Sequence, residues 1–185
     1  MVKIKACVFI SGSGTNLRSI IKNTRDYNFP INIKLVISNK KNARGISYAK
    51  KYSIPYKIIS NRKKKFEQSA QKYINSKKIE LICLAGFMKI LSKNFIRQYK
   101  GKILNIHPSL LPKYKGLNTH ERVIKNNERY SGCTVHFVSS KLDSGKIILQ
   151  KKIKIKKNDT IKSLKGRILK QEHILYPKAI KKIIF

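Results

Sequence analysis

Hydrophobic positions in the first hundred residues predict strands and helices in alternation. Short apolar runs typical of strands lie at 2–10, 33–38, 54–59, 79–85 and 103–107. Apolar residues with helical spacing follow the strands, from Leu17 onward, at 43–52, at 64–77, and from the capping residue Ser92 to about Tyr99. This alternation predicts a Rossmann-like α/β fold, with a mostly parallel twisted sheet and helices on both faces.

The pattern changes after Pro112. Two strand-like segments, 131–138 and 147–155, are joined by too few residues for a crossover helix, so we expect them to pair antiparallel. A short helix at 120–126 precedes them. No internal repeat or linker divides the chain, which favours one domain over residues 1–185.

A final helix is expected near the end of the chain. Asp159 or Thr160 is its predicted cap, and the apolar spacing continues to about Leu175. Tyr176 and Pro177 are then expected to interrupt the helix, because proline cannot donate the helical hydrogen bond.

Composition narrows the class of protein. With 185 residues, of which 41% are hydrophobic, the chain can bury a substantial core. Its apolar runs are too short to span a bilayer, and the first ten residues lead directly into a strand without a signal-peptide pattern. A cytoplasmic protein without membrane attachment is therefore expected.

The high positive charge suggests nucleic acid as a partner. The chain has 43 Lys and Arg but only 8 Asp and Glu, which gives a net charge of +35. However, 35 of the 43 basic residues are lysines, and these are spread over the whole length. Arginine dominates specific recognition of phosphates and bases, so the excess indicates a lysine-rich composition with non-specific attraction for polyanions at low salt. A nucleic-acid-binding protein stays as the alternative class.

Neither cysteines nor histidines show a metal-binding pattern. Cys7, Cys83 and Cys133 are widely spaced in strand-like contexts, which predicts buried, reduced thiols. The four histidines lack H-x-x-H or H-E-x-x-H spacing. No metal site is predicted.

Two polar side chains interrupt the apolar strand at 103–107. Asn105 and His107 are two residues apart, so an amide and an imidazole project from the same face. Pro108 then ends the strand, and ligands of open α/β sheets bind at strand ends. The alternative is that both side chains only satisfy local hydrogen bonds.

A glycine-rich loop, Ser-Gly-Ser-Gly-Thr-Asn at 11–16, joins the first strand to the first helix. Such a loop presents backbone N–H groups and a helix N-terminus to an anion. It lacks the Gly-Lys-Ser/Thr ending of a Walker loop, and Leu17 replaces the third glycine of a dinucleotide fingerprint. A single phosphate is the simplest ligand, and a tight strand-to-helix turn is the alternative.

Six motifs occur in order along the chain: Ser11-Gly-Ser-Gly-Thr-Asn-Leu17, Leu84-Ala-Gly-Phe-Met-Lys-Ile-Leu91, Asn105-Ile-His-Pro-Ser-Leu-Leu-Pro112, Thr134-Val-His-Phe-Val138, Leu142-Asp-Ser-Gly145 and Gln171-Glu-His173 with Tyr176-Pro177. Together they closely resemble phosphoribosylglycinamide formyltransferase, a folate-dependent enzyme family of purine biosynthesis and one-carbon metabolism. The resemblance covers essentially the whole chain.

This resemblance implies a reaction. A formyl group passes from the co-substrate 10-formyltetrahydrofolate to the amine of 5-phosphoribosylglycinamide, without a metal. The resemblance implies Asn105, His107 and Asp143 as the catalytic residues. Asn105 and His107 would stabilise the developing oxyanion, and Asp143 would orient His107 and accept the amine proton. Without the resemblance, Asp143 is an ordinary turn residue.

The resemblance also implies binding residues. The N-terminal half would bind the substrate phosphate, through Gly12, Ser13, Gly14, Thr15 and Asn16. The C-terminal half would supply the folate site and the catalytic loop, with Glu172 binding the ribonucleotide. Without the resemblance, Glu172 is a charge on the surface of the final helix. The folate contacts would be Lys63, Met88, Lys89, Ile90, Leu91 and Asn105, with apolar walls from Leu84 and Val138. His120 and His136 are assigned structural or supporting roles.

Two departures from the family pattern bear on these roles. The stretch 60–65 is shorter than the family's loop, so Lys63 is the expected substitute for a folate-contacting basic residue. The chain also ends soon after its final helix. Methionyl-tRNA formyltransferase and formyltetrahydrofolate hydrolase remain alternatives, although each is expected to carry a further domain. We expect small-molecule substrates, no specific nucleic-acid partner, and a monomer or homodimer.

Overall fold

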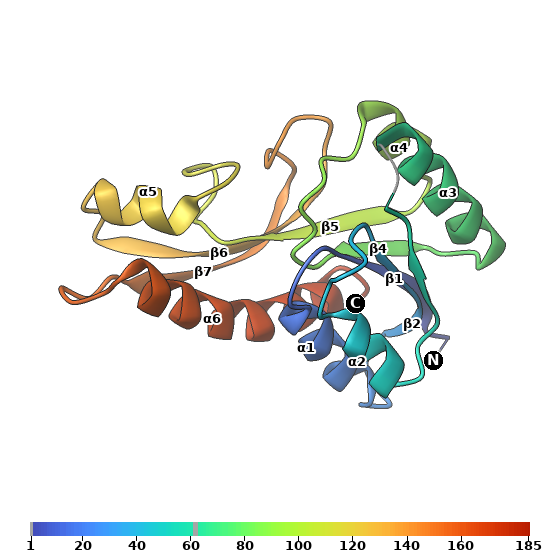
Figure 1. The fold of residues 1–185 in the computed structure, drawn as a ribbon. Coiled ribbons are helices and arrows are strands. Elements are labelled where there is room, and N and C mark those ends of the chain that lie inside the picture. The colour runs from blue at the N-terminus through green and yellow to red at the C-terminus, as the bar shows by residue number, and fades with distance from the viewer. Residues whose placement is uncertain (1, 61–62) are drawn as a thin grey trace. The chain divides into compact units, whose positions relative to one another are not determined.

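The computed structural model describes residues 2–60 and 63–185, apart from the side chains of residues 63 and 64. Its strands are β1 (Ile4–Ile10), β2 (Ile31–Ser38), β3 (Tyr56–Ile58), β4 (Leu81–Leu84), β5 (Lys102–His107), β6 (Tyr130–Phe137) and β7 (Ile147–Lys154). Its helices are α1 (Thr15–Thr24), α2 (Ile46–Lys51), α3 (Lys63–Ser76), α4 (Lys93–Gln98), α5 (Thr119–Lys125) and α6 (Ile161–Lys182) (Figure 1).

The strands form one sheet in the order β3-β2-β1-β4-β5-β6-β7. By their internal contacts the residues divide into two compact units, essentially 1–104 and 105–183, and the boundary falls within β5. The predicted α/β class is confirmed, with a mostly parallel sheet and an antiparallel C-terminal part. The assignment of residues 1–185 to one domain stays a prediction.

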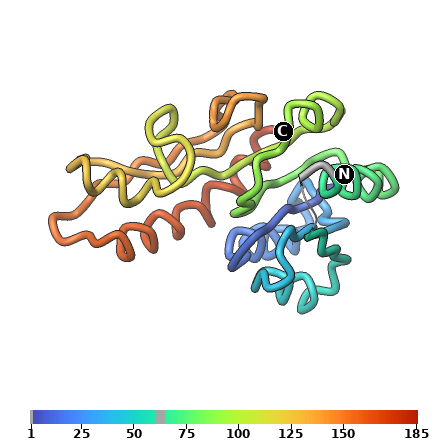
Figure 2. The backbone as a smooth tube through the Cα atoms, turned by 45° about the horizontal axis from the view of Figure 1, so that its top comes forward, coloured from blue at the N-terminus to red at the C-terminus, as the bar shows by residue number. Residues whose placement is uncertain are grey.

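The first unit is built on β1. This strand pairs in parallel with β2 and with β4, so that Cys7 lies between Leu35 and Ile82. Helices α1 and α2 lie on one face of these strands, and α3 and α4 lie on the other (Figures 1 and 2). Because both faces are covered, the strand residues from Ala6 to Ile10 are fully buried, which explains their continuous apolar run.

A carboxylate ties α3 to the start of α4. Glu67 accepts hydrogen bonds from the backbone N–H and the hydroxyl of Ser92, each at 2.6 Å. The Ser92 hydroxyl in turn accepts from the Phe95 N–H at 3.1 Å, so Ser92 caps α4 as predicted. On the same side of the sheet, Phe66 of α3 packs edge-on against Phe9 of β1, with ring centroids 5.8 Å apart.

The second unit contains an antiparallel strand pair and the longest helix of the described residues. Strand β6 pairs with β7, with Val135 opposite Leu149, which confirms the predicted pairing. Helix α6 runs along both strands (Figure 1). Its buried face includes apolar side chains at helical spacing, namely Leu164, Ile168, Leu175, Tyr176, Ala179 and Ile180.

The predicted interruption of the final helix at Tyr176-Pro177 is wrong. Helix α6 continues to Lys182 with Pro177 inside it. Proline cannot donate the helical hydrogen bond, but Tyr176, Ala179 and Ile180 are fully buried around it. Packing of this apolar face outweighs the lost hydrogen bond, and such tertiary packing is invisible to a local pattern.

Other sequence predictions about burial can be checked directly. Cys7, Cys83 and Cys133 are all buried thiols outside any disulfide, as predicted. Burial raises the pKa of the Cys7 thiol well above its usual value, and the neighbouring Cys83 adds to the effect. Over the described residues, every helix is too short or too polar to cross a membrane.

Thr160 begins α6 with a reciprocal pair of hydrogen bonds. Its hydroxyl accepts from the Ser163 N–H at 3.1 Å, and the Ser163 hydroxyl accepts from the Thr160 N–H at 2.9 Å. Replacing Thr160 with alanine removes one of these bonds, so the free energy of unfolding should fall by about 1 kcal/mol. Urea denaturation measures this change. Thr160→Ser is the control and should retain wild-type stability, and an equal loss in both variants would contradict the capping role.

Candidate functional site

The carboxyl end of β5 brings His107 into contact with Asp143. The His107 side chain is buried, and its Nδ1 lies 3.4 Å from Oδ2 of Asp143. On the other side of the ring, Nε2 lies 2.8 Å from the carbonyl oxygen of Tyr114. Both ring nitrogens therefore face oxygen atoms that can accept a hydrogen bond. The expected contact between Asp143 and His107 is present.

Asp143 lies on the loop between β6 and β7, in a left-handed conformation with φ of 45°. Its side chain is only 8% exposed. Oδ2 accepts a hydrogen bond from the Gly116 N–H at 2.9 Å, and Oδ1 lies 3.7 Å from Nε2 of His136. A buried carboxylate is costly unless it is paired, so the contacts of Oδ2 with His107 and the Gly116 N–H fix its position.

Gly145 allows the Asp143 loop to close tightly on β6. A Cβ atom at this position would lie 1.7 Å from the Phe137 carbonyl oxygen, which is impossible without moving backbone. Directly beside it, the Phe137 N–H donates to the Lys146 carbonyl at 2.9 Å. The Asp-Ser-Gly sequence at 143–145 is therefore explained by this close approach and by the left-handed turn at Asp143.

Asn105 meets His136 beside this group. The side-chain nitrogen of Asn105 lies 3.2 Å from Nε2 of His136, and Nδ1 of His136 lies 2.9 Å from the Phe137 carbonyl oxygen. Burial lowers the pKa of His136, and the charge of His107 acts in the same direction, against the Phe137 carbonyl and Asp143. His136 is therefore neutral near pH 7. Asn105, His107 and Asp143 are joined in one cluster within the second unit, with His136 at its centre.

Buried hydrogen bonds hold the segment that follows His107. The Thr134 hydroxyl donates to the Ser109 carbonyl at 2.7 Å and accepts from the Leu111 N–H at 3.2 Å. The Gln150 amide donates to the Leu111 carbonyl at 2.7 Å. Through Thr134 and Gln150, strands β6 and β7 thus fix the chain direction immediately after the catalytic candidate His107.

The glycine-rich loop lies in the first unit, between β1 and α1. Gly14 has φ of 72° and precedes the helix without a side chain to cap it. A Cβ atom on Gly14 would lie 2.3 Å from the Cα of Gly45, so glycine is required there. The first N–H groups of α1 and the positive end of its dipole suit an anion. The structure thus shows a tight glycine turn into α1, and phosphate binding by residues 12–16 stays a prediction.

The predicted folate segment is tied to the end of β1 within the same unit. The Ser11 hydroxyl accepts from the Met88 N–H and donates to the Asn39 side-chain oxygen, both at 2.7 Å. Met88 and Ile90 are 66% and 62% exposed, respectively, so their apolar side chains are free to meet a ligand. By contrast Leu91 is buried and Lys89 stacks over the Phe66 ring, with its Nζ 5.0 Å from the centroid.

Glu172 is buried rather than a helix-surface charge, the interpretation its sequence position alone would give. Its residue is only 6% exposed. The neighbouring Cys133 thiol has its pKa raised to about 12, first by burial and then by the negative charge of Glu172. The Glu172 carboxylate therefore lies within electrostatic range of Cys133 on β6, and its expected role with the ribonucleotide stays a prediction.

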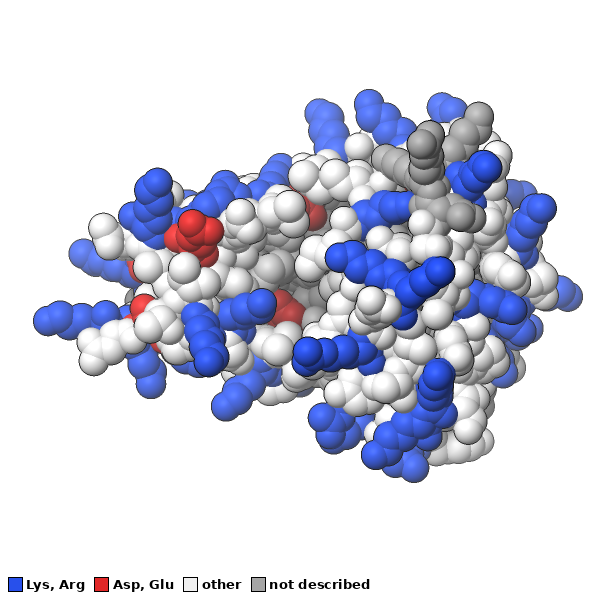
Figure 3. All heavy atoms as spheres, viewed as in Figure 1, with Lys and Arg blue, Asp and Glu red and all other residues white. Residues whose placement is uncertain are grey.

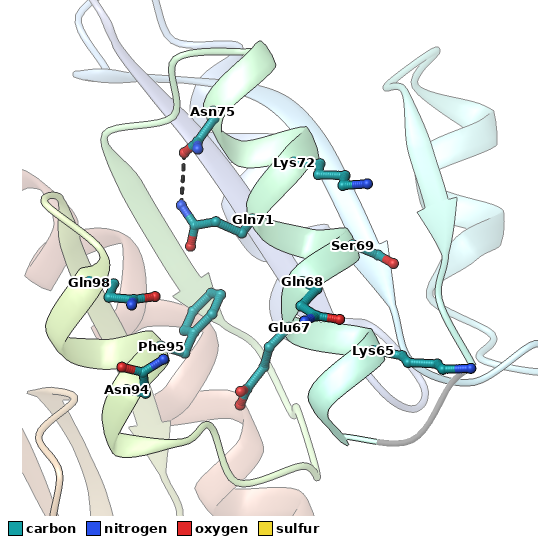
Figure 4. Close-up of a pocket in the computed structure, with 10 residues that line it drawn as sticks. All are labelled: Lys65, Glu67, Gln68, Ser69, Gln71, Lys72, Asn75, Asn94, Phe95 and Gln98. Carbon is teal, nitrogen blue, oxygen red and sulfur yellow. Dashed lines mark hydrogen bonds between the residues drawn. The ribbon is translucent and has the colours of Figure 1, made fainter.

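Lys63 is the first residue of α3, and the prediction for its side chain falls outside the described part of the chain. A surface groove of about 740 Å³ lies farther along this helix, between α3 and α4 (Figure 4). Half of its lining residues are Asn or Gln, and Gln71 donates to Asn75 across one turn of α3 at 2.7 Å. None of the predicted site residues with a described side chain lines this groove.

Positive charge is spread over the surface. Figure 3 shows Lys and Arg side chains across the whole visible face rather than in a single patch, with few acidic side chains among them. This distribution agrees with a lysine-rich composition and gives no outline of a nucleic-acid site on that face.

Comparison with known proteins identifies the family. The family model described as formyl transferase matches residues 4–180. The phosphoribosylglycinamide formyltransferase of Haemophilus influenzae is 44% identical over 183 residues, which span 96% of this chain and 85% of that protein. The chain belongs to the formyl transferase family, among the phosphoribosylglycinamide formyltransferases. The family predicted from the sequence motifs is thus confirmed.

Solved structures of formyl transferases agree with this assignment. The phosphoribosylglycinamide formyltransferase of Coxiella burnetii superimposes with a TM-score of 0.90 at 43% identity, covering 96% of this chain and 85% of that one. The enzyme of the same name from Campylobacter jejuni gives a TM-score of 0.92 at 34% identity, covering 100% and 99%. Both the fold and its strand arrangement are therefore those of this formyl transferase group.

Other relatives are much longer. The trifunctional purine biosynthetic protein adenosine-3 of Gallus gallus is 42% identical over 96% of this chain, but the match spans only 18% of that protein. The human protein of the same name gives 41% identity over the same 18% share. The likeness to these relatives concerns one part of each.

Three contacts of the candidate site were not predicted from the sequence. They are the Tyr114 carbonyl on His107, the Gly116 N–H on Asp143, and the bond between Asn105 and His136. The first two are made by backbone groups, which nearly every residue type carries, so the sequence could not indicate them. His136 did carry a signal, because the Thr-Val-His sequence at 134–136 places it on the same face of β6 as the buried Thr134.

Acid should destabilise the protein through two histidines whose pKa is lowered. Burial is the main cause for both, and for His120 the charge of Lys165 adds to it. Below about pH 6.5 the unfolded state binds protons that the folded state rejects, so the free energy of unfolding falls until the lowered folded pKa is reached. His136→Gln should reduce this loss between about pH 7 and 5.5, measured by urea denaturation at each pH. If the free energy of unfolding of His136→Gln depends on pH as steeply as that of the wild type, the lowered pKa of His136 is contradicted. His120→Gln measures the contribution of His120 in the same way.

Proposed function

We propose that this protein transfers the formyl group of 10-formyltetrahydrofolate to the amine of 5-phosphoribosylglycinamide, a step of purine biosynthesis. The observation that carries the proposal is the cluster of Asn105, His107 and Asp143, with Asp143 3.4 Å from the His107 ring. Membership of the phosphoribosylglycinamide formyltransferases supports the same substrates. The proposed substrates are small molecules, and the proposed reaction is an acyl transfer.

Formyl transfer makes two demands on the site. The amine nitrogen bonds to the formyl carbon, which places negative charge on the formyl oxygen and positive charge on the nitrogen. The bond between that carbon and the folate nitrogen then breaks, and one proton passes from the amine to the departing nitrogen. A donor must therefore face the oxygen, and an acceptor must face the amine.

Asn105 and His107 supply donors for the oxyanion. The Asn105 amide carries two hydrogens, and only one is used by His136. The hydrogen on Nε2 of His107 is directed at the Tyr114 carbonyl. In our proposal the formyl oxygen takes the place of that carbonyl, so His107 gives the same hydrogen to the substrate. Asp143 balances the charge of the His107 ring and accepts the amine proton, directly or through a water.

The remaining residues hold the substrates. We assign the phosphate to the loop from Gly12 to Asn16, where α1 begins, because its N–H groups and glycine geometry suit an anion. We assign the folate to Met88, Ile90 and the backbone around them, because these apolar side chains are exposed. Roles for Lys63 and Glu172 follow from the family resemblance. The expected setting is the cytoplasm, for a monomer or a homodimer.

The high positive charge fits this function without a nucleic-acid partner. Both proposed substrates are anionic, since one carries a phosphate and the folate carries carboxylates. A net charge of +35 raises the encounter rate with such molecules at low ionic strength. Methionyl-tRNA formyltransferase shares the donor pattern, so tRNA is included in the test.

The test follows folate release from 10-formyltetrahydrofolate by the purified protein. Release should require 5-phosphoribosylglycinamide. The same acceptor without its phosphate should have a higher KM than the phosphorylated one. His107→Ala should lower kcat by about 10²- to 10⁴-fold, the usual range for a general acid or base. Its thermal unfolding should resemble that of the wild-type protein, as a control for folding. Release without an acceptor would instead indicate a hydrolase, and release only with methionyl-tRNA would indicate the tRNA enzyme.

A further inference from the structure

His136 has a defined hydrogen on one ring nitrogen. It is 2% exposed on β6, and its Nδ1 lies 2.9 Å from the Phe137 carbonyl oxygen. A carbonyl oxygen can only accept, so Nδ1 must carry the hydrogen. In the neutral ring the other nitrogen, Nε2, is then a bare acceptor.

That bare nitrogen decides which way the Asn105 amide faces. The side-chain nitrogen of Asn105 lies 3.2 Å from Nε2 and can donate to it. If the amide were turned over, its oxygen would meet the lone pair of Nε2 instead, and two acceptors would repel each other. The second hydrogen of the amide group is then free for another acceptor.

Asp143 does not compete for this nitrogen while the ring is neutral. Its Oδ1 lies 3.7 Å from Nε2, which is beyond hydrogen-bond distance, and both atoms are acceptors. A proton on Nε2 would reverse this arrangement, because the ring would then donate towards Asp143 and the Asn105 amide would have to present its oxygen. The burial of His136 favours the neutral ring.

We propose that His136 is a positioning residue that holds the Asn105 amide with its NH₂ group towards the reacting carbon. This rests on the proposed role of Asn105 as a donor to the oxyanion. With the amide reversed, an oxygen would face the developing negative charge, and one donor of the site would be lost. The neutral Nε2 of His136 is thus what keeps the donor in place.

A matched pair of amide substitutions separates the two hydrogen bonds of His136. In His136→Gln the side chain is long enough to place its carbonyl near the position of Nε2, where it can accept from Asn105. In His136→Asn the shorter side chain can still donate to the Phe137 carbonyl but does not reach Asn105. Ser131→Ala is a further control, because it changes another buried side chain of β6 whose hydroxyl has no hydrogen-bond partner among the described residues.

Steady-state kinetics of formyl transfer should distinguish these variants. His136→Asn should lower kcat by about 10- to 100-fold, up to the cost of one lost oxyanion donor, with KM values for both substrates within about twofold of wild type. His136→Gln should retain kcat within about threefold, and Ser131→Ala should match wild type. Equal losses of kcat in the Asn and Gln variants would overturn the proposal. In an Asn105→Ala background the two His136 variants should have the same kcat, and a remaining difference would equally overturn it.

A second measurement does not depend on activity. Nitrogen-15 NMR of the histidine-labelled protein near pH 7 should show one His136 ring nitrogen protonated, Nδ1, and one bare, Nε2. A proton on Nε2 would overturn the proposal. If the wild-type protein releases no folate with 5-phosphoribosylglycinamide, the proposed function fails on its own, while this spectrum still decides the state of His136.

Discussion

The candidate site depends on one buried carboxylate. Asp143 is only 8% exposed, and its Oδ2 contacts both the His107 ring and the Gly116 N–H. A carboxylate in such a place is stable only while these partners remain, so it fixes the His107 ring and the backbone at Gly116 together. The left-handed turn at Asp143 and the tight glycine at 145 serve the same end, because they deliver the carboxylate to the end of β5.

The few carboxylates of this chain accept hydrogen bonds that hold neighbouring segments in place. The chain has 43 basic and only 8 acidic side chains, and several of the acidic ones accept hydrogen bonds from backbone or capping groups. Glu67 binds Ser92, and Glu80 accepts from the Lys5 N–H. Asp159 binds the start of α6, and burial raises its pKa less than its hydrogen bonds from Lys156, Ser163 and Arg167 lower it. Lysine and arginine side chains instead lie across the visible surface, where a solvated charge costs little stability.

Sequence patterns predicted the regular strands and helices, and they predicted which polar side chains share a face at the end of a strand. Alternating runs predicted the parallel strands, and the spacing of Asn105 and His107 predicted their shared face. The pattern failed where tertiary packing decides: α6 runs through Pro177, and Glu172 is buried. It also could not foresee the Tyr114 carbonyl on His107, since any residue supplies that group. The role of His136 needed the atomic contacts, because a buried histidine on a strand has many uses.

The most direct test of the account measures the charge of Asp143 separately from its shape. Asp143→Asn keeps an oxygen that can accept from the Gly116 N–H, but it removes the negative charge beside His107. We expect kcat for formyl transfer to fall by at least about 100-fold, with the variant still folded and still binding both substrates. A variant that transfers the formyl group at the wild-type rate would contradict the central role given to this carboxylate.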